Sequence, residues 1–266
     1  SRLFPPTPWT LEANGTAAGG ILQMRNQPTG DCVGNGYARA IETLLLDLRA
    51  QKYEVQPRAV HPSYIYGGAR MLAGARRGAG ANVALAAKFV FDSGVLFEDT
   101  AGVKRYSEDT NMSDRLGRRW DSAEFKELMQ AAAAFRVTVI KLPSKDNLNA
   151  INTCLDAGCK IAGGFRQKFA AGEFRSGVKF GRLSGSWNHC VSILGRFTDP
   201  TAGYIWGNSH GNRYPGSCVL GTPAWALNLS PSDTERMCSG ASLYAVSFVQ
   251  IGTNKSAADW RPMPVM

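Results

Sequence analysis

The chain changes character near residue 135, and this change limits the folds it can adopt. Before that point apolar residues recur at helical spacing, most clearly between residues 34 and 51 in the run Ile41, Leu44, Leu45 and Leu48. After it, short runs of alternating, β-branched residues predominate, beginning with 136–141. Helices and strands that occupy separate halves of a chain favour an α+β fold over an alternating α/β fold.

The same patterns predict the individual elements. In the first half we expect helices over 34–51, 62–73, 82–92 and 121–135, with a polar loop over 98–120. Asp121 stands three residues before Glu124, the spacing of a capping box, so we place the last of these helices directly after it. In the second half we expect one helix over 144–157 and further strands over 160–165, 189–197, 203–207 and 242–249.

Composition excludes several classes of protein. A chain of 266 residues, 44% of them hydrophobic, can form one large domain over 1–266 or two lobes that share a site. It contains no apolar run of about 18 residues, so we expect no membrane-spanning segment. The first residues lack the apolar core of a signal peptide. The net charge of +9 comes from scattered lysines and arginines, which favours a solvated basic surface over a specific nucleic-acid partner.

One cysteine stands where a nucleophile would be activated. Cys32 lies just before, or in, the first turn of the long helix, where unpaired N–H groups and the helix dipole stabilise a thiolate. Gly30 and Gly34 flank it, which predicts room for a substrate backbone. The even count of six cysteines permits disulfides, but without a visible signal peptide free thiols are favoured, and with only three histidines in the chain we expect no zinc site.

A nucleophilic thiol also needs a base and a group that orients the base. The chain offers His61, His189 and His210. His61 precedes a helix, where a surface or capping role is expected, whereas His189 opens a predicted strand. Asn208 ends the next strand, and two adjacent antiparallel strands would bring its side chain close to His189.

These three blocks resemble a known family. GDC before a long helix, NHC opening a strand and WGNSHG ending the next strand are similar, in this order, to the signature blocks of papain-like cysteine peptidases. The segment HPSYIYGGAR resembles the family's second helix, and the texture of the blocks is nearest to bacterial and phage-encoded members. The resemblance implies a helical lobe over 32–135 and a β-rich, barrel-like lobe over 136–266. Residues 1–31 would cross onto the β-rich lobe, and the active site would lie between the lobes.

The resemblance also implies residue roles. Cys32 would attack the scissile carbonyl of a protein or peptide substrate and form a thioester. His189 would pair with Cys32 as an imidazolium and then protonate the leaving amine, and Asn208 would hold the imidazole. The oxyanion hole would use the Cys32 backbone N–H and the side chain of Gln27. No metal or organic cofactor is expected.

Three departures from the family keep other functions open. Gln27 lies five residues before Cys32, whereas Asn26 holds the usual sixth position. His210 stands where the family has a tryptophan, and Val33 replaces the aromatic residue after the nucleophile. One alternative is a structural protein, for example of a phage virion, with little or no activity and other virion proteins as partners. A thiol-dependent acyltransferase is another. A cytoplasmic or virion location suits these readings; the substrate and the oligomeric state do not follow from the sequence.

Overall fold

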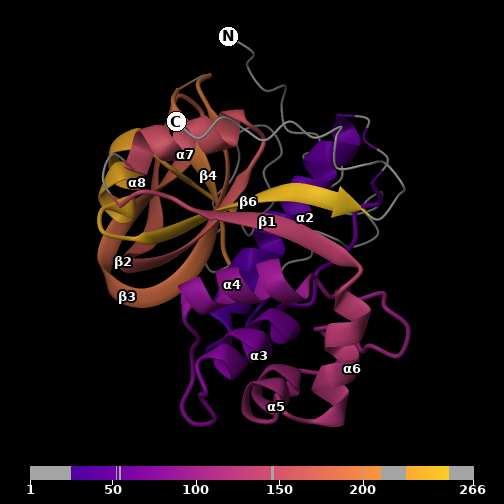
Figure 1. Cartoon of the computed structure of the whole chain (residues 1–266). Coiled ribbons are helices and arrows are strands. Elements are labelled where there is room, and N and C mark those ends of the chain that lie inside the picture. Colours follow the sequence, from indigo (N-terminus) through magenta and orange to yellow (C-terminus); the bar gives the residue numbers. More distant parts are fainter. Residues whose placement is uncertain are drawn as a thin grey trace.

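The helices of the first half and the strands of the second half form separate parts of the molecule (Figure 1). The computed structural model describes residues 25–51, 53, 55–144, 147–199, 201–210 and 226–251. The helices are α2 (Cys32–Ala50), α3 (Pro62–Leu72), α4 (Val83–Ser93), α5 (Met112–Arg118), α6 (Ala123–Ala132), α7 (Asn147–Asp156) and α8 (Pro231–Cys238). The strands are β1 (Phe135–Lys141), β2 (Lys160–Arg175), β3 (Val178–Phe197), β4 (Gly203–Gly207), β5 (Ala226–Leu229) and β6 (Ser242–Ile251).

The long helices and the central strands confirm the sequence predictions, but several details were wrong. The loop expected over 98–120 contains α5, and neither β5 nor α8 was predicted. β2 and β3 are much longer than expected, because they continue as a hairpin to a turn at Ser176, which has a positive φ of 49°. The cap of α6 is Ser122, whose hydroxyl accepts from the Phe125 N–H, and not Asp121.

The strands form one mostly antiparallel sheet that curls towards a barrel. Its order is β1-β6-β2-β3-β4-β5, and β3 also pairs with β5 in parallel at Phe180 and Asn228. β2 lies at the centre, paired with β6 on one side and with β3 on the other. α7 and α8 lie against this part of the molecule, away from α3, α5 and α6 (Figure 1).

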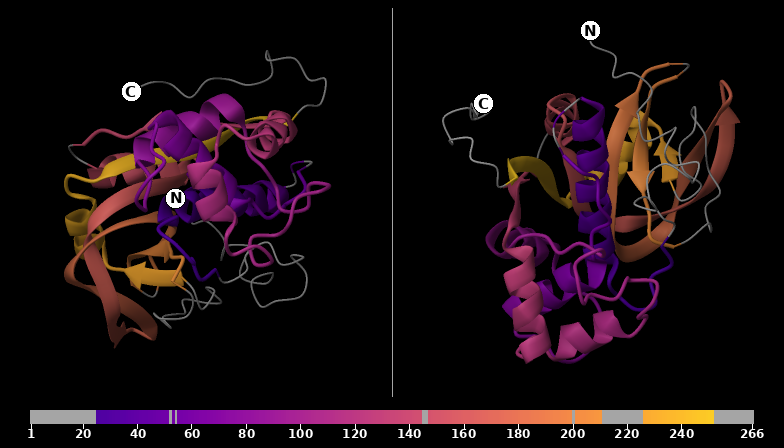
Figure 2. Two further views of the ribbon diagram at one scale, coloured as in Figure 1. Left: turned by 90° about the horizontal axis from the view of Figure 1, so that it is seen from below. Right: turned by 90° about the vertical axis from the view of Figure 1, so that its right-hand side faces the viewer.

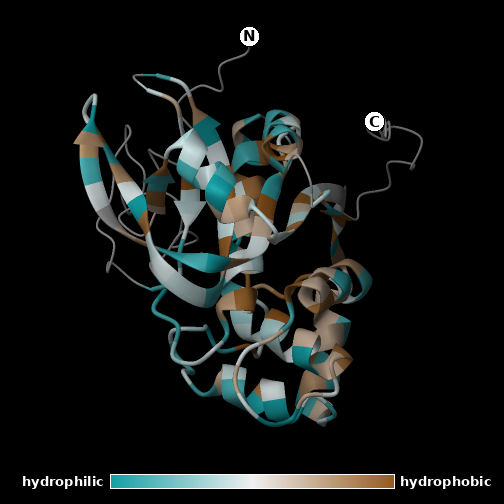
Figure 3. Cartoon of the chain, turned by 90° about the vertical axis from the view of Figure 1, so that its left-hand side faces the viewer, coloured by the Kyte–Doolittle hydropathy of each residue, from teal (hydrophilic) through white to brown (hydrophobic). Residues whose placement is uncertain are grey.

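Two hydrophobic cores correspond to the two parts. The first surrounds the inner faces of α2, α3, α4 and α6 and includes the fully buried rings of Tyr64, Phe89 and Phe125. The second fills the curled sheet beneath α7 and α8 and includes the fully buried Trp206. In Figure 3 hydrophobic segments, in brown, lie where the helical part and the sheet adjoin. The molecule therefore has the expected two-lobed α+β architecture, whereas the lobe boundary at residue 135 stays a prediction.

α2 runs between the other helices and the sheet (Figure 2), and small residues let it approach both. A Cβ added to Gly34 would lie 2.2 Å from the Pro62 carbonyl oxygen at the start of α3. One added to Gly36 would lie 2.7 Å from the Cys190 Sγ atom on β3. Gly34 therefore permits close helix packing, and the prediction that it leaves room for a substrate was wrong. Gly30 is similar, because its added Cβ would lie 2.8 Å from the Gly80 N atom.

Within the described ranges, no helix has the length and apolar character that crossing a membrane requires. The N-terminal residues 1–24 lie outside the described part, so the predicted crossing of residues 1–31 onto the β-rich lobe is open for most of that segment. Its last residues can be followed: Asn26 forms an isolated antiparallel bridge with His210, and the Gln27 N–H donates to the Ser209 carbonyl at 3.0 Å.

Candidate active site

Cys32 is the first residue of α2 and is partly exposed. At this position the first backbone N–H groups of the helix have no partner within the helix. Asp31 precedes it as the N-cap residue, but its side chain makes no capping hydrogen bond. The thiol is therefore close to free backbone N–H groups, which are the groups that stabilise a thiolate or an oxyanion.

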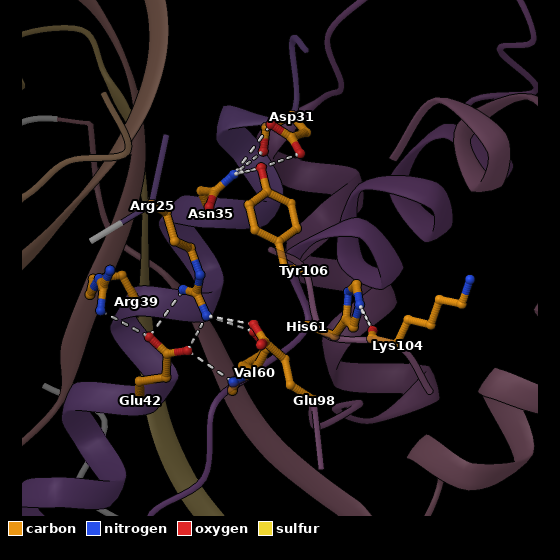
Figure 4. A network of polar contacts seen from close by, with 10 residues as sticks. All are labelled: Arg25, Asp31, Asn35, Arg39, Glu42, Val60, His61, Glu98, Lys104 and Tyr106. Carbon is orange, nitrogen blue, oxygen red and sulfur yellow. Dashed lines mark hydrogen bonds and ion pairs between the residues drawn. The ribbon is translucent and has the colours of Figure 1, made fainter. Parts of the chain in front are cut away.

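The Asp31 carboxylate instead points into the helical lobe (Figure 4). It is fully buried and accepts from the Tyr106 hydroxyl at 2.8 Å and the Ser113 hydroxyl at 2.5 Å. Asn35, one turn into α2, donates to its other oxygen at 3.2 Å. This network joins the start of α2 to the 98–111 loop and to α5. Sequence reasoning missed it, because nothing in the pattern around Tyr106 or Ser113 indicates a partner so far away along the chain.

His189 and Asn208 are brought together by the pairing of β3 with β4. The His189 Nε2 atom lies 3.1 Å from the Asn208 Oδ1 atom, and both side chains are buried. The Ser209 backbone N–H donates to the same Asn208 atom at 2.9 Å. An atom that accepts from a backbone N–H must be the amide oxygen, so His189 Nε2 carries a proton and donates it. The other ring nitrogen, Nδ1, is then unprotonated in the neutral ring and can accept a proton.

Aromatic rings surround this imidazole. His210 stacks on His189 with ring centroids 4.3 Å apart and planes 20° from parallel. Trp187 packs against it with centroids 4.4 Å apart, and its own centroid is 5.8 Å from that of His210. His210 thus covers the imidazole at the position where a tryptophan was expected. It also brings a second titratable ring to the site.

The first turns of α2 contact the middle of β3, where His189 lies. Cys190, which follows His189, is the residue that packs against Gly36, and its backbone N–H forms a hydrogen bond towards the Cys32 thiol. The described residues contain no hydrogen bond between the Cys32 thiol and the His189 ring itself. A separation within roughly 4 Å between the Cys32 sulfur and a ring nitrogen of His189, which allows for a hydrogen bond that is loose without substrate, stays a prediction.

Burial opposes the charging of either residue alone. It raises the pKa of the Cys32 thiol, an effect that the Asp31 charge reinforces and the Cys190 N–H reduces. It lowers the pKa of His189 to about 4, with a further lowering by His210 and an opposing effect of the Asn208 hydrogen bond. A proton moved from Cys32 to His189 would create two opposite charges that compensate each other.

Gln27 contacts Ser209, the residue that follows Asn208. The Ser209 hydroxyl donates to the Gln27 Oε1 atom at 2.5 Å, and the Gln27 Nε2 atom donates to the Thr29 carbonyl at 3.0 Å. Since the amide group has two N–H bonds, one is left after the contact with Thr29. Although Gln27 lies five residues before Cys32 and not six, its side chain is therefore held next to Asn208 through Ser209. Sequence reasoning missed the contact with Ser209.

A buried ion cluster anchors the segment that carries Gln27 (Figure 4). The Arg25 guanidinium donates to both oxygens of Glu42, at 3.1 and 2.5 Å, and to the Val60 carbonyl at 2.9 Å. Glu42 also accepts from Arg39 at 3.2 Å, and Arg25 reaches Glu98 at 3.3 Å. Because Arg25 lies two residues before Gln27, this cluster fixes the Gln27 segment to α2.

His61, which we expected on the surface or as a cap, is fully buried, and that prediction was wrong. Its Nε2 atom lies 3.0 Å from the Lys104 carbonyl (Figure 4), and it forms no capping hydrogen bond. Burial lowers its pKa to about 4. Through Lys104 and Tyr106 it therefore fastens the loop over 98–111. Among the described residues, no group of three or more His, Cys, Asp and Glu side chains could hold a metal ion.

Comparisons with known proteins identify the fold. No family model matches the sequence, and no curated protein matches it. Among solved structures, xylellain, a cysteine protease from Xylella fastidiosa, is similar with a TM-score of 0.58 and 16% identity over 94% of this chain and 92% of that one. Digestive procathepsin L 3 of Tenebrio molitor has a TM-score of 0.53 at 15% identity, covering 85% of this chain and 66% of its own.

Procathepsin B S9 from Trypanosoma congolense has the same TM-score of 0.53 at 11% identity, covering 93% of this chain and 78% of its own. At these identities the likeness establishes the fold, and it confirms the two-lobed papain-like architecture expected from the sequence.

Proposed function

We propose that this chain is a cysteine peptidase that hydrolyses peptide bonds of protein or peptide substrates, with Cys32, His189 and Asn208 as its triad. The single observation that carries the proposal is the Asn208 oxygen shared by His189 and the Ser209 N–H. It sets the tautomer of His189 that leaves Nδ1 free to accept a proton, which is what the base of a nucleophilic thiol needs.

The proposed reaction has two halves. His189 Nδ1 takes the Cys32 proton, and the thiolate attacks the substrate carbonyl carbon. The Cys32 backbone N–H, at the start of α2, and the remaining N–H of Gln27 stabilise the oxyanion. His189 then gives its proton to the leaving amine, which leaves a thioester on Cys32. In the second half His189 takes a proton from water, which attacks the thioester and releases the acid.

Two contacts around the triad have supporting roles in this proposal. Ser209 holds the Gln27 amide, so the oxyanion donor and the His189 partner move as one unit. His210 and Trp187 exclude water from the His189–Asn208 hydrogen bond, which strengthens it.

A scaffold without activity is the second candidate, and one set of observations favours it. Burial shifts the pKa of Cys32 upwards and that of His189 downwards, so both groups tend to stay neutral. Gln27 also uses one N–H on Thr29. A structural role, for instance in a phage virion among other virion proteins, needs none of the chemistry. An acyltransferase would use the same triad with an amine in place of water.

A direct assay separates these candidates. The purified chain is incubated with a denatured protein substrate, beside Cys32→Ala and beside Cys154→Ser, which removes a partly exposed thiol elsewhere. We expect wild type and Cys154→Ser to cleave the substrate equally and Cys32→Ala to be inactive. No cleavage by the wild type would favour the scaffold. Products that carry an added amine, found by mass spectrometry, would indicate acyl transfer.

A further inference from the structure

Two other cysteines are held together by the way α7 ends. The helix stops in a Schellman motif: the Cys159 N–H donates to the Cys154 carbonyl at 2.9 Å, and the Gly158 N–H donates to the Leu155 carbonyl at 3.0 Å. Gly158 has the positive φ, 85°, that this motif requires. In such a motif the side chains of the residues joined by the outer hydrogen bond face each other, and here both are cysteines.

The two thiols influence each other as this geometry predicts, because each is the largest cause of the shift in the other's pKa. The hydrogen bond from the Cys159 N–H to the Cys154 carbonyl also holds the two backbones close together. We therefore infer that their Cα atoms lie at a separation that a disulfide can span. Cys154 is partly exposed on α7, whereas Cys159 is buried directly before β2. One thiol therefore meets solvent and the other lies behind it.

The coupling of the two thiols favours one thiolate beside one thiol. The neighbouring Cys154, with smaller effects of the Ser247 hydroxyl and the Lys160 charge, lowers the pKa of Cys159 against the opposing effect of burial. The pKa of Cys154 is raised, first by the neighbouring Cys159 and then by burial. A pair with one thiolate and one adjacent thiol is the arrangement from which disulfides form.

We propose that Cys154 and Cys159 are an oxidation site, at which a hydroperoxide converts the two thiols into an intrachain disulfide that ties the end of α7 to the start of β2. The thiolate of the pair attacks one peroxide oxygen, the O–O bond breaks, and the second oxygen leaves and takes up the proton that this thiol released, which gives water from hydrogen peroxide or an alcohol from an organic hydroperoxide. The other thiol then attacks the oxidised sulfur, breaks the new S–O bond and gives up its proton as water is released. The two sulfurs lose two electrons and the peroxide gains them.

The site is independent of the proposed triad, and the other described cysteines lack its features. Cys238 is buried, and burial raises its pKa. Cys190 is also buried with a raised pKa, and its neighbour is Cys32 at the candidate active site. Cys218 lies outside the described residues.

Peptide mass analysis tests the proposal directly. Trypsin releases residues 146–160 as one peptide that contains both cysteines and no others. The whole chain is treated with hydrogen peroxide, denatured, alkylated with iodoacetamide and digested. We expect this peptide to lose two hydrogens and take no alkyl group, and to take two after dithiothreitol. Separately oxidised or fully alkylated cysteines, or a crosslink to any other cysteine, would overturn the proposal.

A matched pair of glycine variants tests the geometric cause. Gly158→Ala strains the Schellman motif, while Gly240→Ala places the same strain after α8, where Gly240 has a φ of 70° and open space as at Gly158. Disulfide formation should slow several-fold in Gly158→Ala and stay at the wild-type rate in Gly240→Ala. Equal rates in all three proteins would overturn the role of the motif. Cys154→Ser should form no intrapeptide disulfide.

Discussion

Glu42→Gln tests whether the ion cluster holds the Gln27 segment on α2. The Glu42 carboxylate is fully buried and accepts from Arg25, Arg39 and the Val60 N–H. Glutamine has the same shape but no charge, and its NH₂ group would face groups that only donate. Breaking a buried ion pair by removing one partner costs about 3–5 kcal/mol, because the remaining charges stay buried with less compensation.

The expected change in melting temperature follows from the chain length. Unfolding entropy of about 2.1 cal/mol/K per residue makes 1 kcal/mol worth roughly 2 °C in a chain of this size, so Tm should fall by roughly 6–10 °C. The control is Asp92→Asn, the same change in an exposed pair with Lys88, where the side chains are 42% and 61% exposed. That pair should contribute no more than about 1 kcal/mol.

Thermal unfolding followed by circular dichroism at neutral pH measures both variants beside the wild type. A Glu42→Gln protein that melts within a degree or two of Asp92→Asn would refute the reasoning. It would mean that Arg25 and Arg39 find other partners or water once the carboxylate is gone. If the reasoning holds and the proposed function is right, Glu42→Gln should also lower kcat/KM at a temperature where the protein is still folded.

Three further predictions concern charge and pH. Asp31→Asn removes a negative charge beside Cys32, so the midpoint of the Cys32 alkylation rate against pH should move down; an upward shift would contradict this. His61 has a pKa of about 4 when folded and about 6.5 when unfolded, so its contribution to stability is complete above pH 6.5 and is lost as the pH falls to 4. Tm should therefore fall less steeply over this range in His61→Gln, and parallel curves would exclude the effect. His210→Trp removes a charge next to His189, so the acid limb of kcat/KM should shift to lower pH, and superimposable limbs would show that His210 has no such effect.

The sequence predicted the parts of the site that local patterns define. α2 is long and strongly periodic, so Cys32 could be placed at its first turn. β4 was predicted at its observed bounds, because a short β-branched and aromatic run ends there at Gly207. Pairing of this strand with β3 then accounts for the contact between His189 and Asn208, which needs only two neighbouring strands in the expected order.

The rest of the site depends on contacts between distant segments, which no local pattern shows. α5 is a short helix whose Ser113 packs on Asp31, so its stability comes from the helical lobe and not from its own sequence. His61 precedes Pro62 at a helix start that looked exposed, but the loop over 98–111 covers it. Gly34 was assigned to substrate access because its contact with the start of α3 has no signal in the sequence.

The measurement that tests the central claim most directly is the alkylation of Cys32 by iodoacetamide at about pH 6, in the wild type and in His189→Ala. An ordinary thiol, with a pKa near 8.5, reacts very slowly at that pH, while a thiolate paired with an imidazolium reacts fast. Brief labelling followed by peptide mass analysis gives the rate for each cysteine. The proposed triad predicts that Cys32 is labelled far faster than Cys190 or Cys238 and that His189→Ala abolishes the difference. Slow labelling of Cys32 in the wild type, or fast labelling that survives His189→Ala, would contradict it.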